Sequence, residues 1–224
     1  MILHYRMTTV LLLRHGEITQ SSPRRFVGQS DLPLTDRGRR QAVSWSEPLS
    51  GLPLVGAWCS SLSRCRETAE LALSKQPIQA LPLDGLREIS LGKWEGLSEA
   101  EVRQRYPGEF ERRGSDLANV APAGGESFAQ AQRRAWIALS GILAQTAGLN
   151  NALALVVAHA GINRALICQA LGLPLSNIFS IGQDYAGLSA LEFSTPTPLL
   201  RALNFPPMPA AELATLLSHT KVPC

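Results

Sequence analysis

The residues Arg14 and His15 stand where an apolar segment of the sequence ends, and both can act on an anion. The short apolar run Thr9–Leu13 leads directly into them, and Gly16 follows. A buried strand more often ends in a turn of Gly, Asn, Asp or Pro. Arginine keeps its positive charge, and a neutral imidazole can act as a nucleophile. A single histidine at a strand end is more often a structural residue held by a hydrogen bond.

Two further apolar runs end in the same kind of side chain. Leu54–Cys59 is followed by Arg64, and Ala152–Ala158 is followed by His159. Because ligands bind outside the carboxyl ends of the strands in open α/β sheets, we expect these side chains to converge. Each also stands near the start of a predicted helix, where free N–H groups favour negative charge. The sequence therefore predicts an anion site, with phosphate as the commonest candidate.

The elements that must position these residues follow one another as strand and helix. Short apolar or alternating runs predict strands at 9–13, 54–59, 78–83, 152–158 and 186–193. Helices are expected at 35–46, 61–74, 98–113 with a break near Pro107, 126–146, 162–171 and 210–218. This order predicts an α/β three-layer sandwich, with a mostly parallel central sheet and helices on both faces.

The whole chain, residues 1–224, is expected to form a single domain. Residues 1–7 are interpreted as an N-terminal extension, with Met1 and Met7 as alternative starts. Residues 195–224 are interpreted as a Pro-rich C-terminal arm on the surface, because several prolines fall between 195 and 209.

The composition narrows the class of protein. With 45% hydrophobic and 17% charged residues, the chain is typical of a soluble globular protein. A net charge of +3 is too small to favour a nucleic-acid partner, and no apolar run is long enough to cross a membrane. The four cysteines have no metal-ligand spacing, so we expect reduced thiols and, with them, a cytoplasmic location. We expect neither a metal nor a cofactor. A homodimer is left open.

Several motifs together resemble the histidine phosphatase superfamily, which has the phosphoglycerate mutase-like fold. The segment LLLRHGE, residues 11–17, is similar to the signature of that family. Five later segments are similar to its other motifs in the same order, at 25–42, 60–70, 86–96, 122–127 and 158–164. The resemblance covers roughly residues 8–193.

The resemblance implies a role for each matching residue. His15 would be the nucleophile that forms a phosphohistidine, and Glu88 would be the general acid. The phosphoryl oxygens would be bound by Arg14, Arg64 and His159. The further substrate-binding residues that it implies are Arg25, Ser21, Gly16 and Ala160. Two positions depart from the pattern, since many relatives have Asn in place of Ser21 and Gly in place of Ala160.

From the residues alone, Glu88 is more typical of a surface carboxylate beside a helix. The rival acidic residues are Glu67, Glu70, Glu95 and Glu99. Trp58 and Trp94 are expected to pack in the core. Residues 183–185, before the last predicted strand, are more typical of a polar turn than of a pocket mouth.

Three functions are compatible with the resemblance. The first is a phosphatase acting on a small phosphate monoester, without a metal. The motifs at 86–96 and 122–127 look most like the α-ribazole-5′-phosphate phosphatase branch of cobalamin synthesis, which makes that ester one candidate substrate. The second is a phosphoglycerate mutase, although the interval from Gly96 to Gly125 is short for a mutase. The third is a non-catalytic module that binds a phosphorylated ligand.

Overall fold

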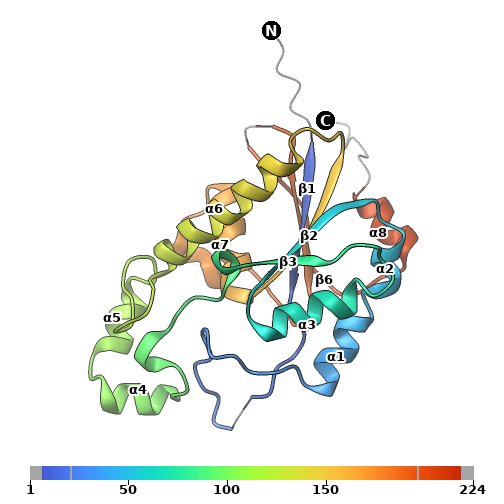
Figure 1. Ribbon diagram of the computed structural model, residues 1–224. Coiled ribbons are helices and arrows are strands. Elements are labelled where there is room, and N and C mark those ends of the chain that lie inside the picture. Colours follow the sequence, from blue (N-terminus) through green and yellow to red (C-terminus); the bar gives the residue numbers. More distant parts are fainter. Residues whose placement is uncertain (1–6, 21, 196, 218–224) are drawn as a thin grey trace.

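The computed structural model describes residues 7–20, 22–195 and 197–217. Its strands form one mixed sheet in the order β3-β2-β4-β1-β5-β6 (Figure 1). The strand bounds are β1 Thr8–Arg14, β2 Leu54–Ser60, β3 Ala80–Leu83, β4 Ala152–Ala158, β5 Leu188–Phe193 and β6 Leu199–Phe205. The first four are parallel to one another, and β5 is antiparallel to both β1 and β6.

The register of β1 and β4 explains why two distant histidines meet. Arg14 stands opposite Ala158 at the carboxyl ends of these parallel strands. His15 and His159 are the next residues along each chain segment, so they leave the sheet side by side. Arg64 reaches the same edge because β2 pairs with the other side of β4.

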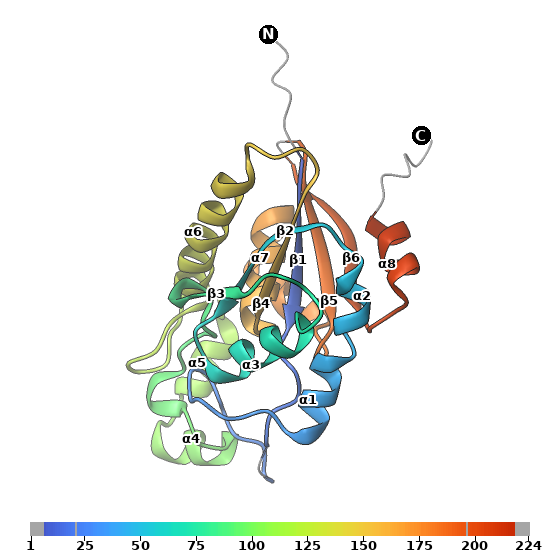
Figure 2. The same cartoon turned by 45° about the vertical axis from the view of Figure 1, so that its right-hand side comes forward.

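Helices cover both faces of the sheet, as Figures 1 and 2 show. Helices α6 (Phe128–Thr146) and α7 (Ala160–Leu171) cover one face. The helices on the other face are α1 Asp36–Val43, α2 Ser46–Ser50, α3 Ser63–Ala72 and α8 Ala210–Leu217. The predicted α/β three-layer sandwich with a mostly parallel sheet is therefore confirmed.

Strand β1 is apolar throughout because both of its faces are buried. Val10 and Leu12 belong to the core beneath α6 and α7. Leu11 and Leu13 belong to the core on the opposite face. All four side chains are fully buried, as expected for a central parallel strand.

Two short helices extend the molecule beyond the carboxyl ends of the strands. Helix α4 (Glu99–Arg105) and helix α5 (Glu109–Ser115) are separated near Pro107, as predicted. Figure 2 shows them at the same end of the molecule as the loop that follows β1. Short 3₁₀ helices occupy Asp84–Leu86, Gly92–Trp94 and Leu175–Ser180.

The structure differs from the sequence expectation in two places. Residues 199–205, which we expected to lie in a surface arm, form β6 at the edge of the sheet. The flanking prolines obscured this strand, although prolines fit the ends of an edge strand. The helix expected over 35–46 ends at Val43, and α2 begins at Ser46. No helix within the described residues is long and apolar enough to cross a membrane.

Candidate active site

A cavity of about 450 Å³ opens at the carboxyl ends of the central strands. Its inner wall contains Arg14, His15, Arg64 and Glu88, which come from four separate parts of the chain. The rest of the lining, here called the outer wall, combines apolar and charged side chains. The apolar ones are Ile18, Phe26, Val27, Ile89, Leu91, Phe110, Phe128 and Phe179, and the charged ones are Arg24, Arg25, Glu99, Arg113 and Arg164. The cavity thus combines many arginines, which suit an anion, with aromatic and aliphatic side chains.

His15 is held so that one ring nitrogen remains available. Its Nδ1 lies 2.7 Å from the carbonyl oxygen of Gly16. A carbonyl can only accept, so Nδ1 carries the proton and Nε2 has the lone pair. The N–H of Gly16 donates to Oγ1 of Thr68 over 3.1 Å, which fixes the turn after β1 to α3.

Arg14 is fixed by the loop before β5. It donates to the carbonyl oxygen of Gln183 over 2.6 Å, and its guanidinium carbon lies 3.8 Å from the ring centroid of Tyr185. Its Nε is buried and has no hydrogen-bond partner among the described residues. The group therefore retains N–H donors for an anion in the cavity.

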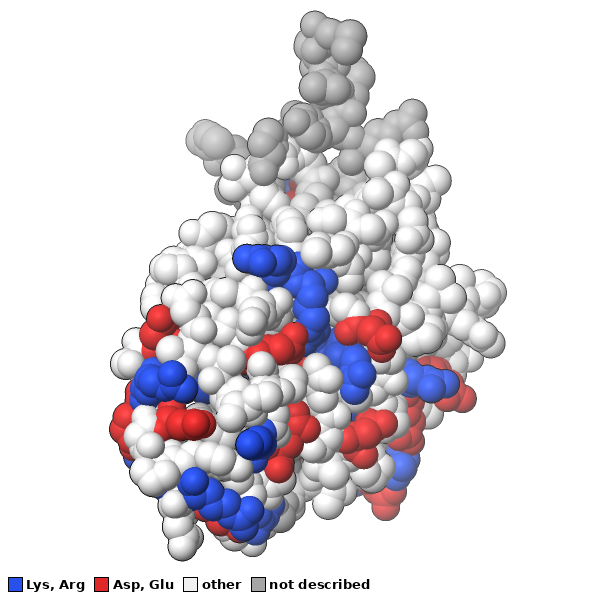
Figure 3. Space-filling view, turned by 60° about the vertical axis from the view of Figure 1, so that its left-hand side comes forward, with Lys and Arg blue, Asp and Glu red and all other residues white. Residues whose placement is uncertain are grey.

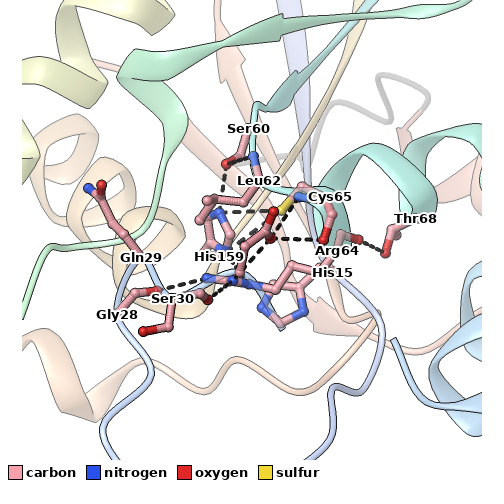
Figure 4. A network of polar contacts seen from close by, with 12 residues as sticks. His15, Gly28, Gln29, Ser30, Ser60, Leu62, Arg64, Cys65, Thr68 and His159 are labelled. Carbon is pink, nitrogen blue, oxygen red and sulfur yellow. Dashed lines mark hydrogen bonds and ion pairs between the residues drawn. The ribbon is translucent and has the colours of Figure 1, made fainter. Parts of the chain in front are cut away.

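Arg64 is almost completely buried, with 1% of its surface exposed. It donates to the carbonyl oxygens of Ser30 and Gly28, each over 2.8 Å, and its Nε donates to Nδ1 of His159 over 3.3 Å (Figure 4). A guanidinium has five N–H groups, so these contacts leave two for a ligand.

His159 lies next to His15, and the two ring centroids are 5.1 Å apart. Its Nε2 is 2.8 Å from Oγ of Ser60. Because Nδ1 accepts from Arg64, Nε2 carries the proton and donates to Ser60. His159 is fully buried and forms no part of the cavity wall itself. It therefore orients Arg64 and packs against His15 in this structure.

Burial and charge keep both imidazoles neutral. Burial, followed by the positive charges of Arg14 and Arg64, holds the pKa of His15 well below its usual value of 6.5. Burial also lowers the pKa of His159 well below that value, with smaller effects from His15 and Arg64. A neutral imidazole is the form that can attack phosphorus.

Glu88 is the predicted acid that the structure places on the inner wall. Its carboxylate accepts from the N–H of Ile89 over 3.0 Å and from the N–H of Gly161 over 3.1 Å. The second contact ties Glu88 to the start of α7, close to His159.

The rival carboxylates are used elsewhere. Glu67 pairs with Arg39, and Glu99 pairs with Arg103 although it lines the cavity. Glu95 accepts from the N–H of Gln29 and from the N–H of Leu91. Glu70 is exposed and does not line the cavity.

The four predicted substrate-binding residues have different positions. Ala160 lines the cavity, as does Arg25, but the guanidinium of Arg25 is already bound to Glu101 and to the carbonyl of Gly96, each at 2.6 Å. Gly16 does not line the cavity, and its N–H and its carbonyl both hold the turn after β1. Ser21 lies outside the described residues.

Several cavity residues were missed or judged unimportant from the sequence. The polar ones include Arg24, Arg113, Arg164 and Tyr185. Tyr185 lines the cavity, whereas its neighbours Gln183 and Asp184 do not. Arg113 on α5 also lines it and is 9% exposed. Its guanidinium carbon lies 5.7 Å from the ring centroid of Trp94 and 5.4 Å from that of Phe128. Its buried Nε has no hydrogen-bond partner among the described residues.

Charges on the outer surface are mixed. On the face in Figure 3, Lys and Arg side chains alternate with Asp and Glu over the lower half of the molecule. Ion pairs between near neighbours in the sequence include Arg103 with Glu99. Within the described part of the chain, no group of three or more His, Cys, Asp or Glu side chains is arranged to hold a metal ion.

Comparison with known proteins identifies similar sequences and structures. Residues 10–206 match the family model described as the histidine phosphatase superfamily (branch 1). Phosphoserine phosphatase 1 of Hydrogenobacter thermophilus is 32% identical over 200 residues, which cover 88% of this chain and 92% of that protein. The adenosylcobalamin/α-ribazole phosphatase of Escherichia coli is 29% identical over 195 residues, covering 86% of this chain and 94% of that protein.

A solved structure has the same fold. The native mycobacterial glucosyl-3-phosphoglycerate phosphatase superposes with a TM-score of 0.80 and 27% sequence identity. The superposition covers 89% of this chain and 99% of that protein.

Proposed function

Because this chain belongs to the histidine phosphatase superfamily (branch 1) and is a phosphoric monoester hydrolase, we propose that it hydrolyses a small phosphate monoester through a phosphohistidine on His15, without a metal. The observation that carries the proposal is the fixed tautomer of His15. Its Nδ1 donates to Gly16, so Nε2 can attack an ester held between Arg14 and Arg64.

The first step transfers the phosphoryl group to the enzyme. A bond forms between Nε2 of His15 and phosphorus while the ester P–O bond breaks, and Glu88 gives a proton to the leaving oxygen. The free N–H groups of Arg14 and Arg64 stabilise charge on the equatorial oxygens. His159 supports this step by holding Nε of Arg64.

The second step returns the enzyme to its starting state. Ionised Glu88 accepts a proton from water as the water attacks the phosphohistidine. Inorganic phosphate leaves, His15 regains its lone pair, and Glu88 is protonated again. Each residue needed for this cycle is on the inner wall or in direct contact with it.

The residues of the outer wall favour particular classes of ester. Phe26, Phe110, Phe128 and Phe179 could pack against an aromatic leaving group, which supports α-ribazole 5′-phosphate as a substrate. Buried Arg113 favours a second class, an ester with another anionic group, because a buried guanidinium gains most from an anionic partner. Phosphoserine is the ester in the name of one relative and has such a group.

The test is phosphate release from para-nitrophenyl phosphate, α-ribazole 5′-phosphate, phosphoserine and 3-phosphoglycerate. Wild type and His15→Ala are compared, each with and without a chelator. We expect release by wild type that is insensitive to chelator and absent in the variant. Acid-labile phosphate on the wild-type protein after a rapid quench would support the intermediate.

Other outcomes would contradict the proposal. Isomerisation of 3-phosphoglycerate without release would identify a mutase-type phosphotransferase. Binding of these esters without turnover by folded wild type would identify a non-catalytic binding module. Loss of activity with chelator would show that a metal is required.

A further inference from the structure

Arg134 of α6 binds the main chain of the segment that carries Glu88. Arg134 donates from Nη1 to the carbonyl oxygen of Gly85 over 3.0 Å and to that of Arg87 over 2.6 Å. Its Nη2 donates to the carbonyl oxygen of Glu88 itself over 2.8 Å. One guanidinium therefore binds the main chain at three points between residues 85 and 88.

Glu126 completes the arrangement from the turn before α6. Nε and Nη2 of Arg134 donate to its two carboxylate oxygens, each over 2.7 Å. Glu126 also accepts from the N–H of Ser90 over 2.9 Å, and its own N–H donates to the carbonyl of Ser90 over 2.8 Å. Glu126 and Arg134 together hold the chain on both sides of Glu88.

These contacts use every N–H of Arg134. A guanidinium has five, and five hydrogen bonds are formed, two to Glu126 and three to main-chain carbonyls. Arg134 does not line the active-site cavity, so it has neither a free donor nor a path to the substrate. Any effect on catalysis must pass through the segment that it holds.

We propose that Arg134 and Glu126 are positioning residues that fix the main chain of residues 85–90, so that the carboxyl group of Glu88 reaches the leaving oxygen. This inference rests on the proposed role of Glu88 as the general acid. The side chain of Glu88 is held by the N–H groups of Ile89 and Gly161. A shift of the main chain at Glu88 would move the carboxyl group relative to α7 and weaken the second of these bonds.

The test compares two aryl esters that differ in how much they need an acid. The leaving group of 2,4-dinitrophenyl phosphate departs without a proton, whereas that of phenyl phosphate requires one. General acid catalysis contributes roughly 10²–10⁴-fold. For Arg134→Lys and Glu126→Gln we therefore expect kcat/KM to fall about 10- to 100-fold on phenyl phosphate. The fall on the dinitrophenyl ester should be much smaller.

Two further variants are the positive and the negative control. Glu88→Gln removes the proposed acid itself and should show the same dependence on the leaving group. Arg133→Lys changes the exposed arginine next to Arg134 and should leave both esters unaffected. Urea unfolding of each variant separates a positioning effect from a general loss of stability.

The outcomes are distinguishable. In one outcome, the loss of kcat/KM in Glu88→Gln depends on the leaving group, but the Arg134 and Glu126 variants lower kcat/KM equally for both esters. Arg134 and Glu126 would then only support the fold, and the positioning inference would be wrong. No loss in either variant would also overturn it. If Glu88→Gln itself shows no dependence on the leaving group, the proposed acid is wrong and the inference fails with it.

Discussion

At the scale of single residues, the active site depends on main-chain groups as much as on side chains. The carbonyl of Gly16 selects the tautomer of His15, and the N–H of Gly161 orients Glu88. Gly161 can have this role because it lacks a side chain. A Cβ atom there would lie 2.5 Å from Oε1 of Glu88.

Gly161→Ala should therefore impair catalysis without unfolding the protein. The added methyl group displaces the carboxylate, which is the movable end of a side chain, and alanine is well tolerated in a helix. We expect a roughly 10- to 100-fold loss of kcat on phenyl phosphate, in line with the contribution of a general acid. Ala160→Gly is the control and should keep nearly full activity. Equal activity of the two variants would contradict this account of Glu88.

Arg113 should affect which ester is preferred. Arg113→Met keeps a long apolar side chain between Trp94 and Phe128 but removes the charge. A hydrogen bond to a charged group is worth about 1.5–3 kcal/mol, so kcat/KM for phosphoserine should fall roughly 10- to 100-fold. The value for para-nitrophenyl phosphate should change little. Arg112→Met, at the exposed neighbouring position, is the control. A uniform loss on both esters would show that Arg113 does not discriminate between them.

At the scale of elements, the sequence predicted the parts of the site that local pattern controls. Apolar runs at 9–13, 54–59 and 152–158 marked the three strands that deliver His15, Arg64 and the second histidine. Their convergence followed from the geometry of parallel strands alone. The family resemblance was needed to select Glu88 among several carboxylates, because it lies between two 3₁₀ helices with no periodic pattern.

Other parts could not be predicted because they depend on tertiary contacts. Nothing in the pattern of α6 distinguishes Arg134 from its neighbour Arg133, although one binds the acid segment and the other is exposed. The contact of Tyr185 with Arg14 joins residues 171 positions apart in sequence. Strand β6 was missed because prolines flank it on both sides.

The segment after Glu88 offers an element-scale test of close packing. Gly92 and Gly96 both have a positive φ, of 52° and 78°, so alanine is strained at either position. A Cβ atom at Gly92 would also lie 2.4 Å from the carbonyl oxygen of Ala123, whereas nothing lies within 4 Å at Gly96.

Gly96→Ala should cost roughly 1–2 kcal/mol, the penalty for a left-handed residue with a side chain. Gly92→Ala should cost clearly more, because the turn at 122–125 must move away. Free energies of unfolding in urea measure both. Equal losses would show that the contact between the acid segment and this turn is not tight in solution.

At the scale of the whole molecule, the two buried histidines of the site make the free energy of unfolding depend on pH. His15 and His159 are buried beside arginines, which opposes their protonation in the folded protein. In the unfolded chain both are free to bind protons near pH 6.5. Well above that pH neither the folded nor the unfolded state binds these protons, so the two histidines do not make stability depend on pH there.

Stability should therefore fall as the pH is lowered from 6.5 towards the folded-state pKa values of these histidines. The unfolded state binds more protons in this window, and each histidine can cost up to about 1.4 kcal/mol per pH unit. Between pH 7.5 and 5.5 the two together should lower the free energy of unfolding by about 2–3 kcal/mol. The carboxylates with lowered pKa values, Glu101 and Glu126, lose their stabilising effect only below about pH 4.5, outside this range.

Urea unfolding at the two pH values, with wild type beside His15→Asn/His159→Asn, separates this effect from all others. The variant lacks both buried imidazoles, so its stability should change much less between pH 7.5 and 5.5. The variant lacks the proposed nucleophile, but its loss of activity does not affect the comparison, because only the free energy of unfolding is measured. An equal fall in wild type and variant would mean that other groups control stability here. In that case, the pKa values of the two imidazoles in the folded protein would not lie well below 6.5, contrary to what their burial beside arginines implies.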